Sequence, residues 1–255
     1  NFSGRINSKE GLSNNYFYSE NRSLAEIISD SLDMPVYLEN DTRAMAFGEY
    51  CEGVVDDEQN IIFLNYSYGV AIGIINEGKL YYGKSGYSGE FGHGNIFNNE
   101  IMCQCGKLGC LETEISGWAL VNQFRDALAE GKQSKINIDV EGSHMEHQAI
   151  IDGALNFEDS LCVELVTKQS ENMGRYLSII LNIFNPDLLV IGGDFAQLGD
   201  YVLLPIQSAL KKYSLGLVNR DMKLKKSSLG RRAGVIGACC VVKEKMLTSL
   251  INKKI

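Results

Sequence analysis

One histidine and three cysteines near the middle of the chain constrain its fold more than any other feature. Nine residues separate His93 from Cys103, while Cys105 and Cys110 follow after one and four further residues. One imidazole and three thiolates are a ligand set that Zn²⁺ takes in closed, four-coordinate sites. Because protein atoms would fill all four positions, no place is left for water. The pattern therefore predicts a structural zinc site.

The residues between the cysteines fit this interpretation. Gly106 and Gly109 allow the backbone to turn tightly enough for the sulfur atoms to converge. The alternative is a group of unrelated core cysteines beside a hydrogen-bonded histidine, but three cysteines within eight residues favour the metal. The other four cysteines lie in apolar stretches and are interpreted as small buried hydrophobic residues. They are Cys51, Cys162, Cys239 and Cys240.

Composition and charge exclude several classes of function. The net charge of −8 argues against a nucleic-acid-binding segment, which needs clustered basic residues. The one basic cluster is predicted to be a solvated edge strand and turn rather than a nucleic-acid contact; it comprises Lys223, Lys225, Lys226, Arg231 and Arg232. His144 and His147 lie in a polar stretch without cysteines and are predicted to face solvent on a helix.

No apolar run approaches the roughly 20 residues that span a bilayer, and no leader precedes the first helix pattern. We therefore expect no membrane partner. Seven cysteines without a secretory signal indicate a reducing compartment, so we expect a cytoplasmic protein. The chain opens at Asn1 rather than methionine, and we expect it to be part of a longer protein.

Hydrophobic periodicity predicts alternating helices and strands, which is typical of an α/β fold. Ser23 and Glu26 form a capping box for a helix that ends near Asp33. A polar stretch at 56–60 is predicted to connect two lobes, and Ser116 is predicted to cap a helix that closes near Gly131. We also expect a strand at 36–38, a helix at 42–50, strands at 61–64, 70–75 and 80–82 forming a meander, a long helix at 160–183 and a buried strand at 188–191.

The residues around the histidine and the three cysteines resemble those of a known family. Residues 90–112 match the zinc signature of the ROK family, E-x-G-H, nine residues, then C-x-C-G-x-x-G-C-L-E. This family gathers repressors and sugar kinases. The resemblance implies an actin-like ATPase (ribonuclease H-like) fold with two lobes around a cleft. The first lobe, incomplete at its N-terminus, is expected to comprise residues 1–54 with a helix at 238–255, and the second residues 55–237.

The resemblance also implies which residues contact a sugar. Glu39-Asn40-Asp41 resembles the family's E-N-D motif, in which the asparagine and aspartate hold sugar hydroxyls and the aspartate is the general base in kinases. Glu90, His93 and Glu112 match further sugar-contacting positions. Carboxylates suit this role because they accept several hydroxyl hydrogen bonds, and a helix N-terminus favours an ionised Asp41. Alternatively, Asp41 is only the helix N-cap and Glu112 a buried anchor for the zinc loop.

The nucleotide-binding motifs of the family are less well matched. ROK kinases begin with a D-x-G-G-T hairpin, and we expect this chain to begin after that position. The second phosphate loop, T-G-x-G-x-G, is replaced by a segment in which Tyr68 and Ala71 add bulk, although Gly69 and Gly73 remain. Ser67 could supply a hydroxyl if the loop were shifted by one residue. The pair at 192–193, Gly192 and Gly193, matches a turn near the nucleotide site.

Three functions follow from this resemblance. The first is the effector domain of a ROK-type regulator, which binds a sugar or sugar phosphate and acts on DNA through a helix-turn-helix domain upstream of this chain. The second is an ATP- and Mg²⁺-dependent, glucokinase-like sugar kinase that lacks its first phosphate hairpin here and uses Asp41 as general base. The third is a scaffold with neither activity. The resemblance further implies a homodimer or homotetramer.

Overall fold

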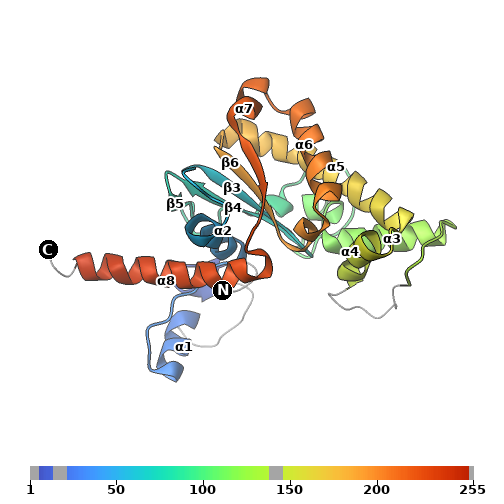
Figure 1. The fold of residues 1–255 in the computed structure, drawn as a ribbon. Coiled ribbons are helices and arrows are strands. Elements are labelled where there is room, and N and C mark those ends of the chain that lie inside the picture. Colours follow the sequence, from blue (N-terminus) through green and yellow to red (C-terminus); the bar gives the residue numbers. More distant parts are fainter. Residues whose placement is uncertain (1–5, 14–21, 138–145, 253–255) are drawn as a thin grey trace. The chain divides into compact units, whose positions relative to one another are not determined.

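The computed structural model describes residues 6–13, 22–137 and 146–252 (Figure 1). Two compact units make up the chain. Unit 1 comprises residues 1–63, 72–89 and 227–255, and unit 2 comprises residues 64–71 and 90–226. The division runs through strands β3 (Ile61–Tyr66) and β4 (Val70–Asn76), each of which contributes residues to both units. The lobe boundaries expected from the sequence, after residues 54 and 237, stay a prediction.

The elements that lie wholly in unit 1 are β1 (Ile6–Asn7), β2 (Leu12–Ser13), α1 (Leu24–Leu32), α2 (Asp41–Glu52), β5 (Lys79–Leu80) and α8 (Ala233–Asn252). The capping box is present: Ser23 accepts from the Glu26 backbone and Glu26 accepts from the Ser23 backbone. Asp33 ends α1 in the left-handed conformation, as expected. The strand predicted at 36–38 is absent, because no named strand of the described chain pairs with these residues.

Unit 2 is richer in helices. Its elements are α3 (Gly117–Ala129), α4 (Glu146–Asn156), α5 (Ser160–Phe184), β6 (Leu188–Gly192), α6 (Asp200–Tyr213), α7 (Gly216–Asp221) and β7 (Lys223–Lys226), with short 3₁₀ turns at Phe91–His93, Leu111–Thr113 and Asp194–Leu198. Ser116 caps α3 by accepting from the Ala119 backbone, as the sequence predicted. Asn185, in the left-handed conformation before Pro186, ends α5.

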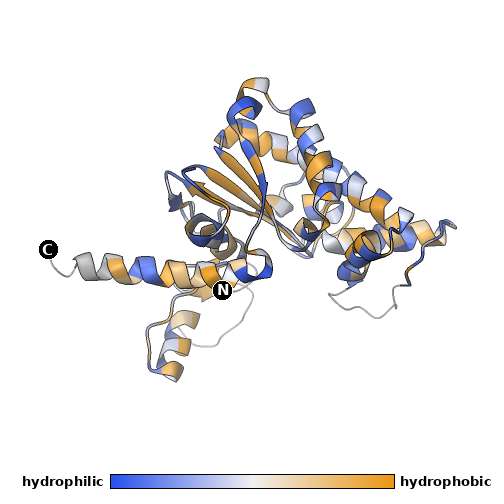
Figure 2. Cartoon of the chain, in the orientation of Figure 1, coloured by the Kyte–Doolittle hydropathy of each residue, from blue (hydrophilic) through white to orange (hydrophobic). Residues whose placement is uncertain are grey.

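One mixed sheet of five strands has the order β5-β4-β3-β6-β7, where β3 is Ile61–Tyr66 and β4 is Val70–Asn76. β4 and β5 are antiparallel, and Glu77 and Gly78 join them with positive φ, the geometry of a two-residue hairpin turn. β6 and β7 are parallel. The middle strands are apolar (Figure 2), whereas β7 is an edge strand that carries the lysines, which confirms the edge-strand prediction for the basic cluster.

Small residues let α2 and α8 cross closely in unit 1 (Figure 1). A Cβ atom at Gly237 would lie 1.7 Å from the Ala44 carbonyl oxygen, and one at Gly48 would lie 2.4 Å from the Ala233 carbonyl oxygen. The two helix backbones are therefore in contact, and no larger side chain fits at this crossing. The contact fixes α2, whose N-terminus bears the Glu39–Asp41 motif.

The cysteines outside the metal motif are less buried than expected. Cys162 is fully buried, as predicted, but Cys51 and Cys239 are exposed and Cys240 is half-buried. The interpretation of these three as core residues is wrong, because the C-terminal turn of α2, which carries Cys51, and the face of α8 that carries Cys239 and Cys240 are open to solvent. Cys51 and Cys240 line a cavity of about 470 Å³ in unit 1 that contains none of the predicted site residues.

Among the described residues, every helix is too short or too polar to span a membrane.

Candidate metal centre and ligand site

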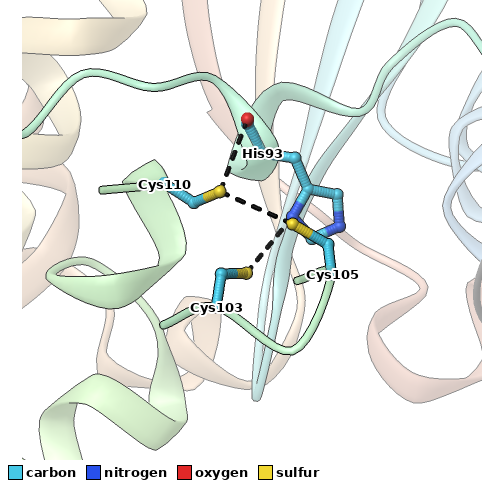
Figure 3. Close-up of side chains that lie close together, drawn as sticks. All are labelled: His93, Cys103, Cys105 and Cys110. Atoms are coloured by element: carbon cyan, nitrogen blue, oxygen red, sulfur yellow. Dashed lines mark hydrogen bonds between the residues drawn. The ribbon is translucent and has the colours of Figure 1, made fainter. Parts of the chain in front are cut away.

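His93, Cys103, Cys105 and Cys110 converge in unit 2 (Figure 3). Their candidate ligand atoms all lie within 4.8 Å of one another. His93 Nδ1 lies 3.6 Å from Cys103 Sγ, and Cys105 Sγ lies 3.6 Å from Cys110 Sγ. Ligand atoms about 2.3 Å from a tetrahedral metal would be separated by about 3.8 Å, so the spacing fits a metal ion of the size of zinc.

The chemistry of these thiols also fits a cation. Burial, together with the neighbouring thiols of Cys105 and Cys103, raises the pKa of the Cys110 thiol to about 12. Burial also raises the pKa of the Cys103 thiol. Thiols clustered in this way do not ionise together unless a positive charge joins them, because each new thiolate would repel the next. A bound cation would reverse this preference and release the thiol protons.

Glycines and short turns shape the loop that carries the cysteines. Gly106 and Gly109 have φ of 83° and 66°, as expected from their place between the ligands. A Cβ atom at Gly109 would lie 2.3 Å from the Phe97 carbonyl oxygen, so only glycine fits there. Isolated bridges, Asn95 with Cys110 and Met102 with Leu108, are the only β-type pairings of this loop among the described residues.

Two carboxylates flank the imidazole of His93. Glu90 Oε2 lies 3.8 Å from Nε2, and Glu112 Oε2 lies 3.8 Å from Nδ1. The side chains of Glu90 and His93 are about one-third exposed, whereas that of Glu112 is 12% exposed. Since Nδ1 faces Cys103, Nδ1 is the atom placed to bind a metal, and Nε2 points to Glu90. The structure thus brings together the unit 2 residues that the sequence predicted for the sugar and for the metal.

Glu112 has a second contact that the sequence did not reveal. Its Oε1 accepts a hydrogen bond of 2.7 Å from the Val70 backbone N–H at the start of β4. Oε2 lies 3.9 Å from Cys103 Sγ. The alternative interpretation of Glu112, as an anchor for the metal loop, is therefore structurally correct whether or not the same side chain also contacts a sugar.

The Glu39–Asp41 motif lies at the N-terminus of α2 in unit 1. Asn40, rather than Asp41, is the N-cap: its side chain accepts from the Arg43 N–H at 3.0 Å. The N-cap interpretation of Asp41 is thus wrong, because Asp41 is already the first helical residue. Burial raises the pKa of Asp41, although hydrogen bonds from Thr42 and the charge of Arg43 lower it. Desolvation therefore outweighs the helix terminus that we expected to favour the ionised form.

A buried ion pair holds this motif, and sequence reasoning missed it. Arg43 Nε donates to Glu39 Oε1 at 2.8 Å, and the two side chains are 2% and 3% exposed. Glu39 also accepts from Ser8 and Tyr82, and the remaining Arg43 donors reach backbone carbonyls of Ile6 and Gly86. The spacing of four residues from glutamate to arginine, across the start of the helix, was the available signal.

Close packing accounts for the glycines predicted at a nucleotide site. A Cβ atom at Gly69 would lie 2.6 Å from Glu112 Oε1, and one at Gly73 would lie 2.5 Å from Ala46 Cβ. Gly193 has a φ of 82°, and its Cβ would lie 2.4 Å from the Tyr66 carbonyl oxygen. Gly192 is buried in β6. Their role in nucleotide binding stays a prediction, since close packing alone would require glycine at positions 69, 73 and 193.

His147 is buried rather than solvated. It is 4% exposed, and its Nε2 lies 3.1 Å from Asp194 Oδ2. Its ring lies beside Tyr68, with the ring centroids 5.8 Å apart. The prediction of a solvent-facing helix is wrong for this histidine because α4 packs it against the turn after β6. His144 lies outside the described residues.

Comparisons with known proteins give a consistent result. The model of the ROK family matches residues 3–245. A glucokinase from Halalkalibacterium halodurans is 29% identical over 87% of this chain, and the transcriptional regulator NagC of Escherichia coli K12 is 30% identical over 91%.

Solved structures show the same two classes of protein. A ROK family transcriptional regulator, a homolog of the E. coli MLC protein, aligns over 92% of this chain with a TM-score of 0.79 and 29% identity. A ROK glucokinase from Streptomyces griseus, in complex with glucose and AMPPNP, aligns over 86% with a TM-score of 0.73 and 29% identity. These neighbours confirm the actin-like fold. The chain spans 67% of the first glucokinase, 56% of NagC and 59% of the solved regulator.

Proposed function

Because the chain belongs to the ROK family, which contains both regulators and glucokinases, we propose that it is the sugar-binding effector region of a transcriptional regulator. Its ligand is a sugar or sugar phosphate, and its effect on DNA is exerted through a domain outside this chain. The observation that carries the sugar-binding part is the pair of carboxylates, Glu90 and Glu112, on either side of His93.

The chemistry of this group suits a polyol. Ionised carboxylates accept charge-assisted hydrogen bonds from hydroxyl groups, and a sugar offers several hydroxyls on one face. His93 Nε2, which does not face the cysteines, is available to donate to or accept from a further hydroxyl. Asn40 and Asp41 in unit 1 are proposed to hold the remaining hydroxyls, by analogy with the E-N-D motif of the family.

Zinc is the metal that we propose for His93 and the three cysteines. Three thiolates and one imidazole suit Zn²⁺ better than Mg²⁺ or Ca²⁺, which prefer oxygen ligands. The ion would hold the loop that presents Glu90 and Glu112, so its removal is expected to weaken sugar binding. The protein's own ligands fill a tetrahedral set, which supports a structural role.

The second candidate is an ATP-dependent sugar kinase, and the residues of the second phosphate loop favour the regulator over it. A phosphate loop offers its backbone N–H groups to phosphate oxygens. Here the Val70 N–H donates to Glu112, and the same carboxylate fills the space beside Gly69. Tyr68 and Ala71 add further bulk where the family's loop carries threonine and glycine.

Calorimetric titration of the full-length protein tests the sugar-binding part. We expect binding of at least one of glucose, N-acetylglucosamine, xylose and their phosphates, with an affinity that falls when the metal is removed. Asp41→Asn and Glu90→Gln are expected to weaken it at least tenfold. Silence across the panel would contradict the sugar-binding proposal.

A coupled ATP assay of the same protein separates the regulator from the kinase. We expect no sugar-dependent ATP turnover, together with DNA binding that responds to the sugar found by calorimetry. Turnover that Asp41→Asn abolishes would reverse the ranking in favour of the kinase, because an aspartate general base is required only for phosphoryl transfer.

A further inference from the structure

Glu112 joins two parts of unit 2 through the two oxygens of one carboxylate. Oε1 accepts from the Val70 N–H at 2.7 Å. Oε2 lies 3.8 Å from His93 Nδ1 and 3.9 Å from Cys103 Sγ. The side chain comes from the short turn after Cys110 and is only 12% exposed. One end of the carboxylate is thus tied to the main chain of a strand, and the other end faces the candidate metal ligands.

Two glycines leave the room that this arrangement needs. At Gly92, a Cβ atom would lie 2.2 Å from the Val70 carbonyl oxygen and 2.9 Å from Glu112 Cγ. At Gly69, apart from its two chain neighbours, the only heavy atoms of the described residues within 4 Å of an added Cβ are Glu112 Oε1 at 2.6 Å and Glu112 Cδ at 3.6 Å. Gly69 does not have a left-handed φ, so an alanine there meets no backbone strain. A methyl group at position 69 would collide with the carboxylate alone.

We infer that Gly69 and the Val70 amide are positioning elements of the ligand site. They fix the direction of the Glu112 carboxylate and thereby set the sugar affinity of the metal loop, without contacting the sugar themselves. Their effect on sugar affinity depends on the proposed function, whereas their effect on the direction of the carboxylate does not. By resemblance Gly69 belongs to a phosphate loop. In this inference, glycine is required there because it leaves room for the Glu112 carboxylate.

The Glu112 side chain can rotate about several bonds unless a contact restrains it. An unrestrained carboxylate samples several rotamers, and a ligand must select one of them at a cost in entropy. The Val70 N–H donates a charge-assisted hydrogen bond that removes this freedom before the ligand arrives. Oε1 retains a second lone pair and Oε2 faces the metal loop, so the fixed carboxylate can still accept from hydroxyl groups.

Gly69→Ala tests the inference, and Gly216→Ala is its matched control. Gly216 also lies in unit 2 and lacks a left-handed φ, and outside its own helix and chain neighbours no heavy atom of the described residues lies within 4 Å of an added Cβ. The control therefore reproduces the change from glycine to alanine without a collision. Both variants are to be compared with Glu112→Ala and with the double variant Gly69→Ala/Glu112→Ala.

Two readouts need no sugar. The first is the chemical shift and exchange rate of the Val70 amide by NMR, which report its hydrogen bond. The second is the visible absorption spectrum of the protein loaded with Co²⁺, which reports the surroundings of the metal ligands. We expect Gly69→Ala to move both in the same direction as Glu112→Ala, the double variant to add nothing further, and Gly216→Ala to match the wild type.

The third readout is the affinity for glucose, N-acetylglucosamine and xylose by calorimetry. For the sugar that the wild type binds, we expect Gly69→Ala to weaken binding about tenfold, as for loss of one charge-assisted hydrogen bond. Gly216→Ala should bind as the wild type does. A merely structural role for Gly69 would lower thermal stability without moving the cobalt spectrum, and that result would overturn the inference.

Failure of the inference can be told apart from failure of the proposed function. An unchanged Val70 amide and cobalt spectrum in Gly69→Ala overturn the inference even if the wild type binds sugar. If Gly69→Ala changes the Val70 amide and the cobalt spectrum but leaves the sugar affinity unchanged, the inference that Gly69 sets the sugar affinity is overturned. If the wild type binds none of the three sugars or their phosphates, the proposed function and that same part are both overturned, and the spectra alone then decide the direction of the carboxylate.

Discussion

The two regions proposed to contact a sugar are held in place by different means. In unit 1, the Glu39–Asp41 segment is fixed by protein atoms alone, through the buried Glu39–Arg43 ion pair and the Asn40 helix cap. In unit 2, Glu90 and Glu112 lie on short turns next to a loop whose β-type pairings, among the described residues, are two isolated bridges. The cysteines and histidine of that loop converge, but their thiols need a cation to ionise together.

This difference predicts two kinds of response. A buried ion pair is part of the cooperative core, so its loss destabilises the unit as a whole. A metal-held loop follows an equilibrium of its own, set by metal concentration and pH. The first region should therefore be ordered without metal, and the second should depend on it. The predictions below test this contrast, beginning with the largest expected effect.

Removal of one metal ligand should affect unit 2 most. Structural zinc contributes on the order of 10 kcal/mol to the folding of small zinc-binding peptides. We expect Cys105→Ser to lower the free energy of unfolding by more than about 5 kcal/mol and to abolish metal binding. Calorimetric unfolding and elemental analysis measure the two effects. Cys239→Ser is the control, because Cys239 is exposed and lies in unit 1. Retention of metal in Cys105→Ser would mean that Cys105 is not a ligand, and loss of metal with unchanged stability would mean that the loop closes without the ion.

Loss of the buried arginine should be the next largest effect. Arg43→Ala leaves Glu39 as an uncompensated buried charge, which costs about 3 to 5 kcal/mol. Urea unfolding measures this loss, and the metal content should not change because the ligands lie in unit 2. Arg22→Ala is the control: its pair with Asp30 is exposed and is expected to contribute less than about 1 kcal/mol. Equal effects of the two variants would remove the contrast between the regions.

Asp159 provides a carboxylate in unit 2 that needs no metal. Burial would raise its pKa, but N–H groups of Cys162 and Lys135 and the Ser134 hydroxyl hold it at about 2. Because the folded pKa lies below the ordinary value of 3.8, the stabilisation is full above pH 4 and is lost as the pH falls towards 2. Asp159→Asn should cost about 2 kcal/mol at pH 7 and much less at pH 2. Urea unfolding at several pH values measures this difference.

A matched control for Asp159 is Glu164→Gln. The pKa of Glu164 is lowered by a hydrogen bond from Lys132, but this pair is exposed to solvent. We expect no measurable change in stability from this variant at either pH. An equal loss of stability in both variants would show that the pH dependence does not come from the Asp159 carboxylate.

Asp41 should show the opposite sign, with the smallest effect. Burial raises its pKa, so the folded state binds a proton more tightly than the unfolded state does. Its contribution to stability is therefore greatest at low pH and declines as the pH rises through its folded pKa. Asp41→Asn, which removes the charge, should leave stability at pH 7 unchanged or raise it by up to about 1 kcal/mol. A loss comparable to that of Asp159→Asn would mean that Asp41 is stabilised as an anion.

The sequence predicted the local structure well wherever local chemistry decides it. The capping box at Ser23, the Ser116 cap, the β4–β5 hairpin and the end of α5 at Asn185 all depend on residues within one or two turns of each other. It failed where distant segments decide the outcome. Residues 36–38 have the composition of a strand but pair with no named strand of the described chain, and His147 has polar neighbours in sequence but is buried beside Tyr68 and Asp194 in space.

The amino-acid sequence by itself determined the four candidate metal ligands, the carboxylates beside them and the family, because these depend on residue types at short, fixed spacings. Only the tertiary structure decided how each carboxylate is held. It brings Ser8 and Tyr82, which are 31 and 43 positions away in the chain, to Glu39 inside unit 1, and it ties Glu112 to the Val70 amide, 42 positions away. Hydrogen bonds across such separations exist only after strands and turns have packed, so no local pattern encodes them.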